Sequence, residues 1–420
     1  MMMTLRRRSA RTIMFLQAVF ILAAFLLLSL RNEEFDMVAV VMGVGLMLFN
    51  IIQFSTLKIA FVHIERFTLL AAQFLWSLGL IVLYRISADI AIKQFIFLFV
   101  GSFAMIIVML VIRKSRNFGK WNWFFMGATL VLLLSTLIFA QVQGGARNWL
   151  NIAGFSLQPS EFAKLLFIMV SAFFLSTREK LSSFIPYILF AGACVIMLVA
   201  SRDLGAGLLI SGTFLLMFFA ATGRTLLALL GLGVFGVGAY ASYKVFPHVR
   251  SRVQIWQDPW ASYHEQGGGF QVVQGLIALA SGGLLGTGLG RGMPSAIPVS
   301  SSDYIFAVIG EEFGIIFGIF VIIFYLVFIV RGILIALNAE ETYDAILVFG
   351  CTAMFSLQSF IIIGGVIKLI PLTGITLPFI SAGGSSLLAS MMQLGMIQGV
   401  ALKNGRKEDE ELAMMGVDIR

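Results

Sequence analysis

The chain is poor in charge and in the residues that usually bind metals. Only 12% of its 420 residues are charged, and it contains two cysteines and three histidines. Cys194 and Cys351 stand alone within apolar runs, no CxxC pattern occurs, and the histidines are not at ligand spacing, so neither residue type predicts a metal site. A soluble domain carries about twice this share of charge. The composition therefore excludes an ordinary soluble protein.

Long apolar runs take the place of the missing charge. Hydrophobic residues make up 59% of the chain, and they fall in runs of about 18 to 25 residues, the length that crosses a membrane as a helix. Only helices or closed barrels satisfy backbone groups in lipid, so the sequence predicts an all-α polytopic membrane protein with about twelve spans. The spans are centred near residues 21, 46, 75, 102, 131, 168, 192, 213, 235, 318, 355 and 390.

The basic residues are topology signals and not a nucleic-acid surface. The net charge is +8, but most lysines and arginines lie in short loops between apolar runs and form no single block. Their alternation places the N- and C-termini of a multi-pass membrane protein in the cytoplasm. No small-residue cleavage site follows the first apolar run, so we interpret this run as an uncleaved first span.

Polar residues gather at the ends of spans that this topology places outside. Glu161 and Lys164 are three residues apart at the start of an apolar run, so they share a helix face and can pair. Ser160 could cap that helix. The pair is either a structural ion pair or one wall of a substrate cavity. A second cluster contains Arg202 and Asp203, whose side chains point about 100° apart on a helix and should have different partners.

The segment from about residue 246 to 302 is the longest predicted outer loop. It holds Arg250, Arg252, Asp258 and Gln274, and its apolar, glycine-rich middle at residues 271–285 predicts a helix at the membrane interface. The glycines at residues 286–292 are no nucleotide site, because no strand precedes them and no Gly-Lys-Ser or Gly-Lys-Thr follows. Such backbone could instead lie near an anionic headgroup.

Two more clusters follow this loop. Glu311 and Glu312 are adjacent acids just inside a predicted span, where charge is costly and usually functional. Residues 371–386 are rich in Thr, Ser and Gly, a composition typical of close helix packing or of irregular backbone that lines a cavity.

At these residues the sequence resembles the SEDS family, the FtsW, RodA and SpoVE cell-wall glycosyltransferases. The segments that carry the resemblance occur in the family's order and cover about residues 67 to 402; they are GGARNWLNIAGFSLQPSEFAK, SRDLGAG, DPW with GLIALASGGLLGTGLGRG, SDYIFAVIGEEFG and PLTGITLPFISAGGSS. Arg202 stands where the family usually has proline, and Ala382 where an aromatic residue is frequent.

The resemblance implies a ten-helix glycosyltransferase core with two extra helices in front. We therefore divide the chain into residues 1–60, a cytoplasmic end and extra hairpin, residues 61–402, the transferase domain with its large outer loop at 246–302, and residues 403–420, a cytoplasmic tail. The implied reaction polymerises lipid II, and the implied partner is a class B penicillin-binding protein that cross-links the glycan. Asp258 matches the family's essential outer-loop carboxylate, while Arg147, Glu161, Lys164 and Asp203 match its cavity residues.

These matches give a mechanism as an expectation. Asp258 would act as the general base, strengthened by burial beside Trp256 and Trp260, although an Asp-Pro pair can also simply form a turn. Arg147 and Lys164, helped by Arg250 or Arg252, would hold the diphosphate. Gln274 of the outer loop is a further candidate for substrate binding.

No cofactor is certain, but a divalent cation, Mg²⁺ or Mn²⁺, could share the charge of the diphosphate. Two alternatives are a flippase that transports lipid II, which would not need a carboxylate in an outer loop, and a non-catalytic scaffold for the transpeptidase.

Overall fold

A computed structural model of the chain describes residues 2–31, 34–115, 118–143, 146–152, 155–177, 184–263 and 268–414. Within these ranges the backbone alone is described for residues 2–9, 118–119, 141–143, 146–147, 152, 155 and 407–414. Helices dominate throughout.

The helices before the large outer loop are α1 (Met2–Ser29), α2 (Met37–Ala60), α3 (Arg66–Ile86), α4 (Ala88–Lys114), α5 (Asn122–Phe139), α6 (Pro159–Thr177), α7 (Ile185–Ala200), α8 (Leu204–Thr222) and α9 (Thr225–Val245). The remaining helices are α10 (Pro247–Gln257), α11 (Gly268–Gly282), α12 (Ile305–Leu337), α13 (Thr342–Val366) and α14 (Gly384–Met414), with short 3-10 turns η1 (Phe118–Trp121) and η3 (Pro294–Ala296).

The spans expected from hydropathy are confirmed. In the described part of the chain, 11 helices are long and apolar enough to cross a membrane. The predicted span near residue 192 is α7, an apolar helix that is shorter than the others. The middle of the outer loop forms α11, as its composition predicted.

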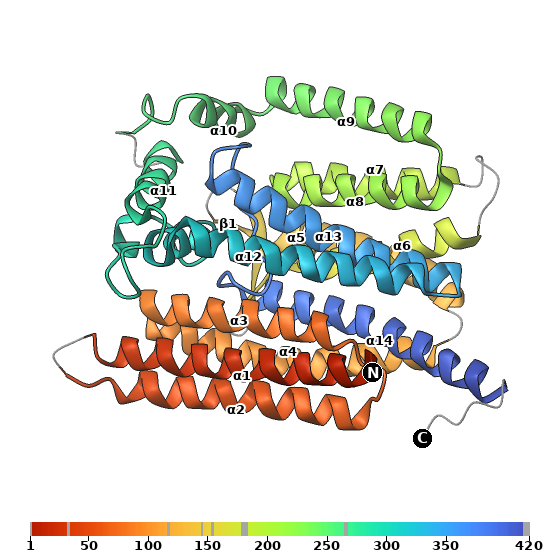
Figure 1. Ribbon diagram of the computed structural model, residues 1–420. Helices are drawn as coiled ribbons and strands as arrows, with labels where there is room; N and C mark the ends of the chain where they lie inside the picture. The colour runs from red at the N-terminus through yellow and green to blue at the C-terminus, as the bar shows by residue number, and fades with distance from the viewer. Residues whose placement is uncertain are drawn as a thin grey trace.

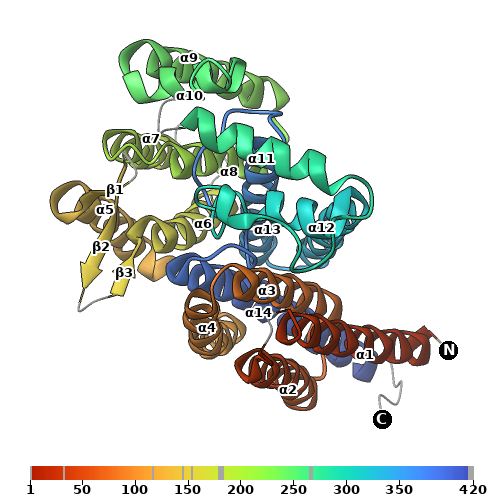
Figure 2. The same cartoon turned by 90° about the vertical axis from the view of Figure 1, so that its left-hand side faces the viewer.

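The helices lie roughly side by side, so that their ends form two opposite faces of the molecule (Figure 1). Both termini lie on one of these faces, and α10 and α11 lie on the other. Figure 2, an end view, shows α9 at the rim of the bundle, where α9 buries no residue. We refer to the face with α10 and α11 as the outer face.

The two extra helices pack against α3 through polar contacts as well as apolar ones. Trp76 donates its Nε1 hydrogen to Asn50 Oδ1 at 2.9 Å, and Asn50 donates to Ser77 Oγ at 2.9 Å. Gln17 of α1 donates to the carbonyl of Leu70 at 2.8 Å. Because lipid offers no alternative partners, such bonds specify how helices dock. The hairpin is therefore a fixed part of the bundle.

The described strands lie between α5 and α6. Strands β1 (Gln141–Gln143), β2 (Ala146–Ile152) and β3 (Phe155–Leu157) form an antiparallel sheet in the order β1-β2-β3. Gln141 pairs with Trp149, and Leu150 with Leu157. The sheet leads directly into Pro159, the first residue of α6.

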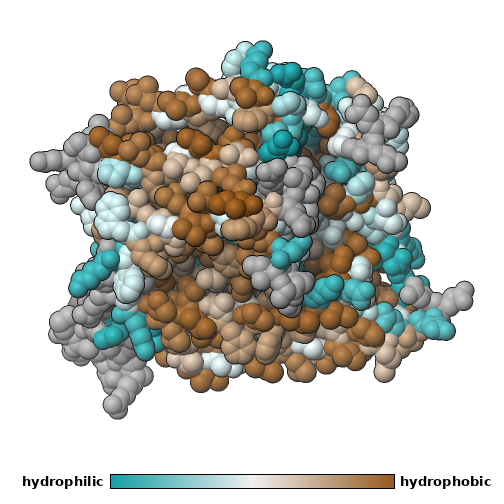
Figure 3. All heavy atoms as spheres, turned by 180° about the vertical axis from the view of Figure 1, so that it is seen from behind, coloured by the Kyte–Doolittle hydropathy of each residue, from teal (hydrophilic) through white to brown (hydrophobic). Residues whose placement is uncertain are grey.

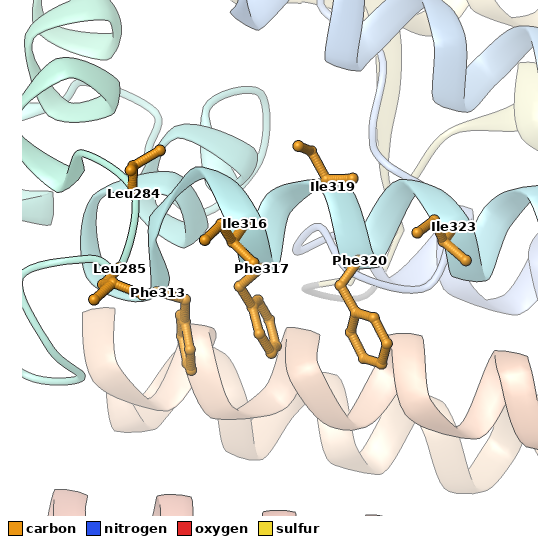
Figure 4. Close-up of a pocket in the computed structure, with 8 residues that line it drawn as sticks. All are labelled: Leu284, Leu285, Phe313, Ile316, Phe317, Ile319, Phe320 and Ile323. Atoms are coloured by element: carbon orange, nitrogen blue, oxygen red, sulfur yellow. The ribbon is translucent and has the colours of Figure 1, made fainter.

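The middle of the bundle's surface is apolar. Figure 3 shows brown side chains over much of the rear face, with hydrophilic ones at its left margin and scattered through its right half. A hollow of about 380 Å³ lies along the outer half of α12 (Figure 4). Its lining is apolar: Leu284, Leu285, Phe313, Ile316, Phe317, Ile319, Phe320 and Ile323. It suits hydrocarbon and not a polar headgroup, so a headgroup site must lie elsewhere.

Candidate functional site

A buried ion pair stands at the start of α6. Lys164 Nζ lies 2.9 Å from Glu161 Oε2, with only 5% and 9% of the two side chains exposed, which confirms that the residues pair. Lys164 also donates to Gln358 Oε1 of α13 at 3.4 Å. Gln358 in turn donates to the carbonyl of Thr376 at 2.9 Å. The pair is thus both internal and connected across helices.

Asp203 joins α6 to α8. As the N-cap of α8, its Oδ1 accepts the backbone N–H of Ala206 at 3.1 Å, an arrangement that satisfies an otherwise unpaired helix donor. Its Oδ2 accepts from Ser160 Oγ at 3.1 Å and from Gln158 Nε2 at 3.4 Å. The expectation that Ser160 caps its own helix is wrong, since α6 already begins at Pro159 and the hydroxyl turns to Asp203.

The segment before α14 closes this polar cluster. Thr376 and Ser386 hydroxyls lie 2.6 Å apart, and Ser385 Oγ accepts the backbone N–H of Gln158 at 3.1 Å. Ser381 donates to the carbonyl of Ser302 at 2.7 Å. Four of the sequence motifs, which lie far apart in the chain, therefore meet near the outer ends of α6, α8, α12, α13 and α14.

Arg252 connects the outer loop to this cluster. Its Nη1 donates to the carbonyl of Thr373 at 2.8 Å, and Asp303 and Asp203 lie within electrostatic range. Burial lowers the pKa of Arg252, while the two carboxylates oppose this shift. Burial also raises the pKa of Asp303, against a hydrogen bond from Ser302 and the charge of Arg252.

Asp258 caps the C-terminal end of α10 and is exposed. The expected burial beside Trp256 and Trp260 is not found. Asp258 Oδ1 accepts the backbone N–H groups of Trp260 at 3.1 Å and Ala261 at 3.2 Å, the pattern by which an aspartate stabilises a turn. Asp258 therefore stabilises a turn, and its carboxylate is also exposed to solvent.

The other expected ligands do not converge on Asp258 in the described structure. Arg250 is exposed and donates to the carbonyl of Lys244 at 2.8 Å. Since residues two apart on a helix point about 200° apart, Arg250 and Arg252 occupy different faces of α10. Gln274 of α11 donates to Tyr263 Oη at 3.4 Å. The side chain of Arg147, in β2, lies outside the described residues.

A second buried cluster joins Glu312, which the sequence marked as unusual, to Arg85, which it did not. Glu312 is 1% exposed and accepts Arg85 Nε at 2.8 Å, together with the N–H groups of Gly290 at 3.0 Å and Gly292 at 3.2 Å. Arg31, after α1, lies beside Gly290. The glycine-rich loop thus binds a carboxylate of its own chain.

The acids at residues 311–312 were visible in the sequence, but their partner was not. Arg85 stands at the end of an apolar run, where an arginine usually marks the membrane boundary. Because Arg85 and Glu312 are 227 residues apart, no local sequence pattern indicates that they pair. One sign of the pair was present in the sequence: Arg85 lies at the end of a predicted span, and a charged residue there needs a partner.

The comparisons with known proteins agree with this arrangement of motifs. The model of the FtsW/RodA/SpoVE family, described as "Cell cycle protein", matches residues 57–405. Peptidoglycan glycosyltransferase RodA of Mycobacterium leprae is 32% identical over 425 residues, covering 94% of this chain and 90% of that protein. Stage V sporulation protein E of Bacillus subtilis is 35% identical over 352 residues, covering 78% and 94%.

Solved structures share the fold. A structure described as "Structural coordination of polymerization and crosslinking by a peptidoglycan synthase complex" covers 81% of this chain and 98% of its own, with a TM-score of 0.68 and 22% identity. Rod shape determining protein RodA of Thermus thermophilus covers 80% and 96%, with a TM-score of 0.61 and 23% identity. Five motifs, an extended family match and a common fold agree, and this chain belongs to the SEDS family of FtsW, RodA and SpoVE proteins.

Proposed function

We propose that this chain is a peptidoglycan glycosyltransferase that polymerises lipid II at the outer face of the bacterial cytoplasmic membrane. The observation that carries the proposal is the convergence of polar motifs beneath the loop that bears Asp258. Relatives that match most of the chain are named peptidoglycan glycosyltransferases. A membrane-embedded bundle with a polar outer face suits a substrate that has a lipid tail and a sugar headgroup.

The reaction joins two lipid-linked disaccharides. A hydroxyl oxygen of the acceptor forms a bond to the anomeric carbon of the donor, while the bond from that carbon to the diphosphate breaks and its electron pair leaves with the diphosphate-lipid. Asp258 accepts the hydroxyl proton. Its Oδ1 already accepts two backbone N–H groups, which fixes the carboxylate and leaves Oδ2 for the acceptor. A positioned base contributes roughly 10²- to 10⁴-fold.

The remaining predicted residues divide by burial. Glu161, Lys164 and Asp203 are buried and partnered, so we propose that they shape the wall beneath the substrate. Arg147, Arg250, Arg252 and Gln274 come from outer segments, and we propose contacts with the sugar or the diphosphate. The apolar hollow on α12 (Figure 4) offers a surface for lipid.

We also propose that a divalent cation takes part in binding the diphosphate. No group of three or more His, Cys, Asp or Glu residues in the described structure could hold one, so Mg²⁺ or Mn²⁺ would be held chiefly by the diphosphate itself. A polymerisation rate that falls with EDTA and recovers with either ion would support this role.

The proposed partner is a class B penicillin-binding protein. A structurally similar chain comes from a complex that coordinates polymerisation and crosslinking. We further propose that both termini are cytoplasmic, because they lie together opposite α10 and α11 (Figure 1) and the loops on their side are the more basic.

The test uses the purified chain with its transpeptidase, labelled lipid II and gel separation of glycan products. We expect long glycan from the wild type and none from folded Asp258→Asn. Equal polymer from both would remove Asp258 from the reaction. No polymer from either, with an active partner present, would favour the flippase.

A further inference from the structure

Arg202 occupies an unusual position in the turn between α7 and α8. Its φ of 60° lies in the left-handed region that favours glycine, and its side chain is exposed. The SEDS pattern usually has proline here. A non-glycine residue in this conformation is strained, and residues of this kind cluster at functional sites. The turn thus presents a cation in a strained conformation.

Helix α10 brings two more basic residues to the same turn. His248 and Arg252 are four residues apart on α10, so they share one face, and Arg252 binds the carbonyl of Thr373. The same segment packs against the start of α8, since a Cβ on Gly205 would lie 3.1 Å from the Thr373 carbonyl. Figure 2 likewise places α10 above α7 and α8.

The electrostatic surroundings of His248 are positive. Burial lowers the pKa of His248, and the charges of Arg202 and Arg252 lower it further. The nearby carboxylates of Asp203 and Asp303 act on Arg252, and Asp203 is also occupied by its helix cap and by Ser160. Two arginines therefore flank His248, and the two carboxylates lie on the Arg252 side.

Two polar atoms in this place have no hydrogen-bond partner in the described structure: His248 Nε2 and Thr373 Oγ1, both buried. A buried polar atom without a partner destabilises the fold, and each such atom in a folded protein calls for a partner. Both atoms can donate to the oxygen of an anion. The ring of His248 is meanwhile held against Phe246, with centroids 5.6 Å apart.

We infer that Arg202, His248 and Arg252 form an anion subsite that binds the diphosphate of the acceptor lipid II. The inference rests on the proposed function. His248 and Asp258 stand at opposite ends of α10, about 15 Å apart along the helix axis at 1.5 Å per residue. In the donor, the bond that breaks adjoins the diphosphate. In the acceptor, growth of a linear chain requires the hydroxyl of the distal sugar, two rings away from its own diphosphate. The separation fits the acceptor.

The test counts bound substrate without turnover. In the Asp258→Asn background, native mass spectrometry of the protein with lipid II should show up to two bound molecules. Arg202→Gln and His248→Gln should each leave one, with about 10- to 100-fold weaker binding of the second, the effect of losing a charge-assisted hydrogen bond. Arg202→Lys should restore the second molecule. Arg224→Gln, an exposed arginine at the opposite end of α8 from Arg202, is the matched control and should bind two.

Three results would overturn the inference. The first is that Arg202→Gln still binds two lipid II molecules, and the second is that the folded variant binds none. The third is that phosphatidylglycerol competes equally, which would make the subsite one for membrane lipid in general. In polymerising protein, Arg202→Gln should raise the KM for lipid II and keep kcat. If the wild type makes no glycan but its binding of diphosphate-lipid still depends on Arg202, the proposed function is rejected and the subsite is not.

Discussion

Replacing Glu312 by glutamine should destabilise the outer half of the bundle strongly. Glu312 and Arg85 side chains are 1% and 6% exposed, and Nε lies 2.8 Å from Oε1. Arg85 also donates to the carbonyl of Gly292 at 2.8 Å. Removing one partner of a buried pair leaves an uncompensated charge and costs about 3–5 kcal/mol. We expect a loss of that order in the free energy of unfolding for Glu312→Gln, and a similar loss for Arg85→Gln.

The two single variants and the double variant form a thermodynamic cycle. When both charges are absent no charge is left unpaired, so the double variant should lose less than the sum of the single losses. Unfolding in detergent, followed by circular dichroism, measures each value. Variants of the Lys403–Asp344 pair, where 18% of the lysine side chain is exposed, give a matched comparison and should lose less. Single losses below about 1 kcal/mol that simply add would refute this reasoning, because exposed pairs behave in that way.

Three further predictions concern other parts of the chain. His248→Gln should reduce the loss of stability on acidification below about pH 6.5. The folded protein holds the His248 proton less tightly than the unfolded chain, so acid favours unfolding in the wild type; acid titration of unfolding measures this. Asn50→Leu, which removes the acceptor of Trp76, should cost about 1–2 kcal/mol in detergent unfolding. Gly395→Ala should lower the apparent Tm, because its Cβ would lie 2.5 Å from the Met105 carbonyl; an unchanged Tm would contradict this close helix contact.

The span pattern was predictable because hydropathy is a local property. Each long helix carries its own signal in about 20 residues, and α7 was found by composition despite its length of 16 residues. The Glu161–Lys164 pair was predictable for the same reason, since three residues on a helix fix the geometry. Local rules of this kind need no knowledge of the fold.

Contacts between distant segments were not predictable. Asp203 and Ser160 are 43 residues apart, and the hydroxyl of Ser160 had a plausible local use as a cap. The sequence likewise suggested a buried Asp258, because two tryptophans flank it. In the structure Trp256 turns away to donate to the carbonyl of Lys368 at 3.1 Å. Which way each side chain faces depends on what the helix packs against, and this information is not local.

The anchoring of α10 explains how an exposed carboxylate can be held in place. Arg252 and Trp256 are four residues apart and share a face, and both donate to carbonyls of one segment, at Thr373 and at Lys368. Asp258 follows two residues later and accepts two backbone N–H groups. Its position thus depends on contacts that α10 makes two and six residues earlier. A change at Trp256 should therefore lower the rate of polymerisation without altering its pH dependence, since the base is displaced but chemically unchanged.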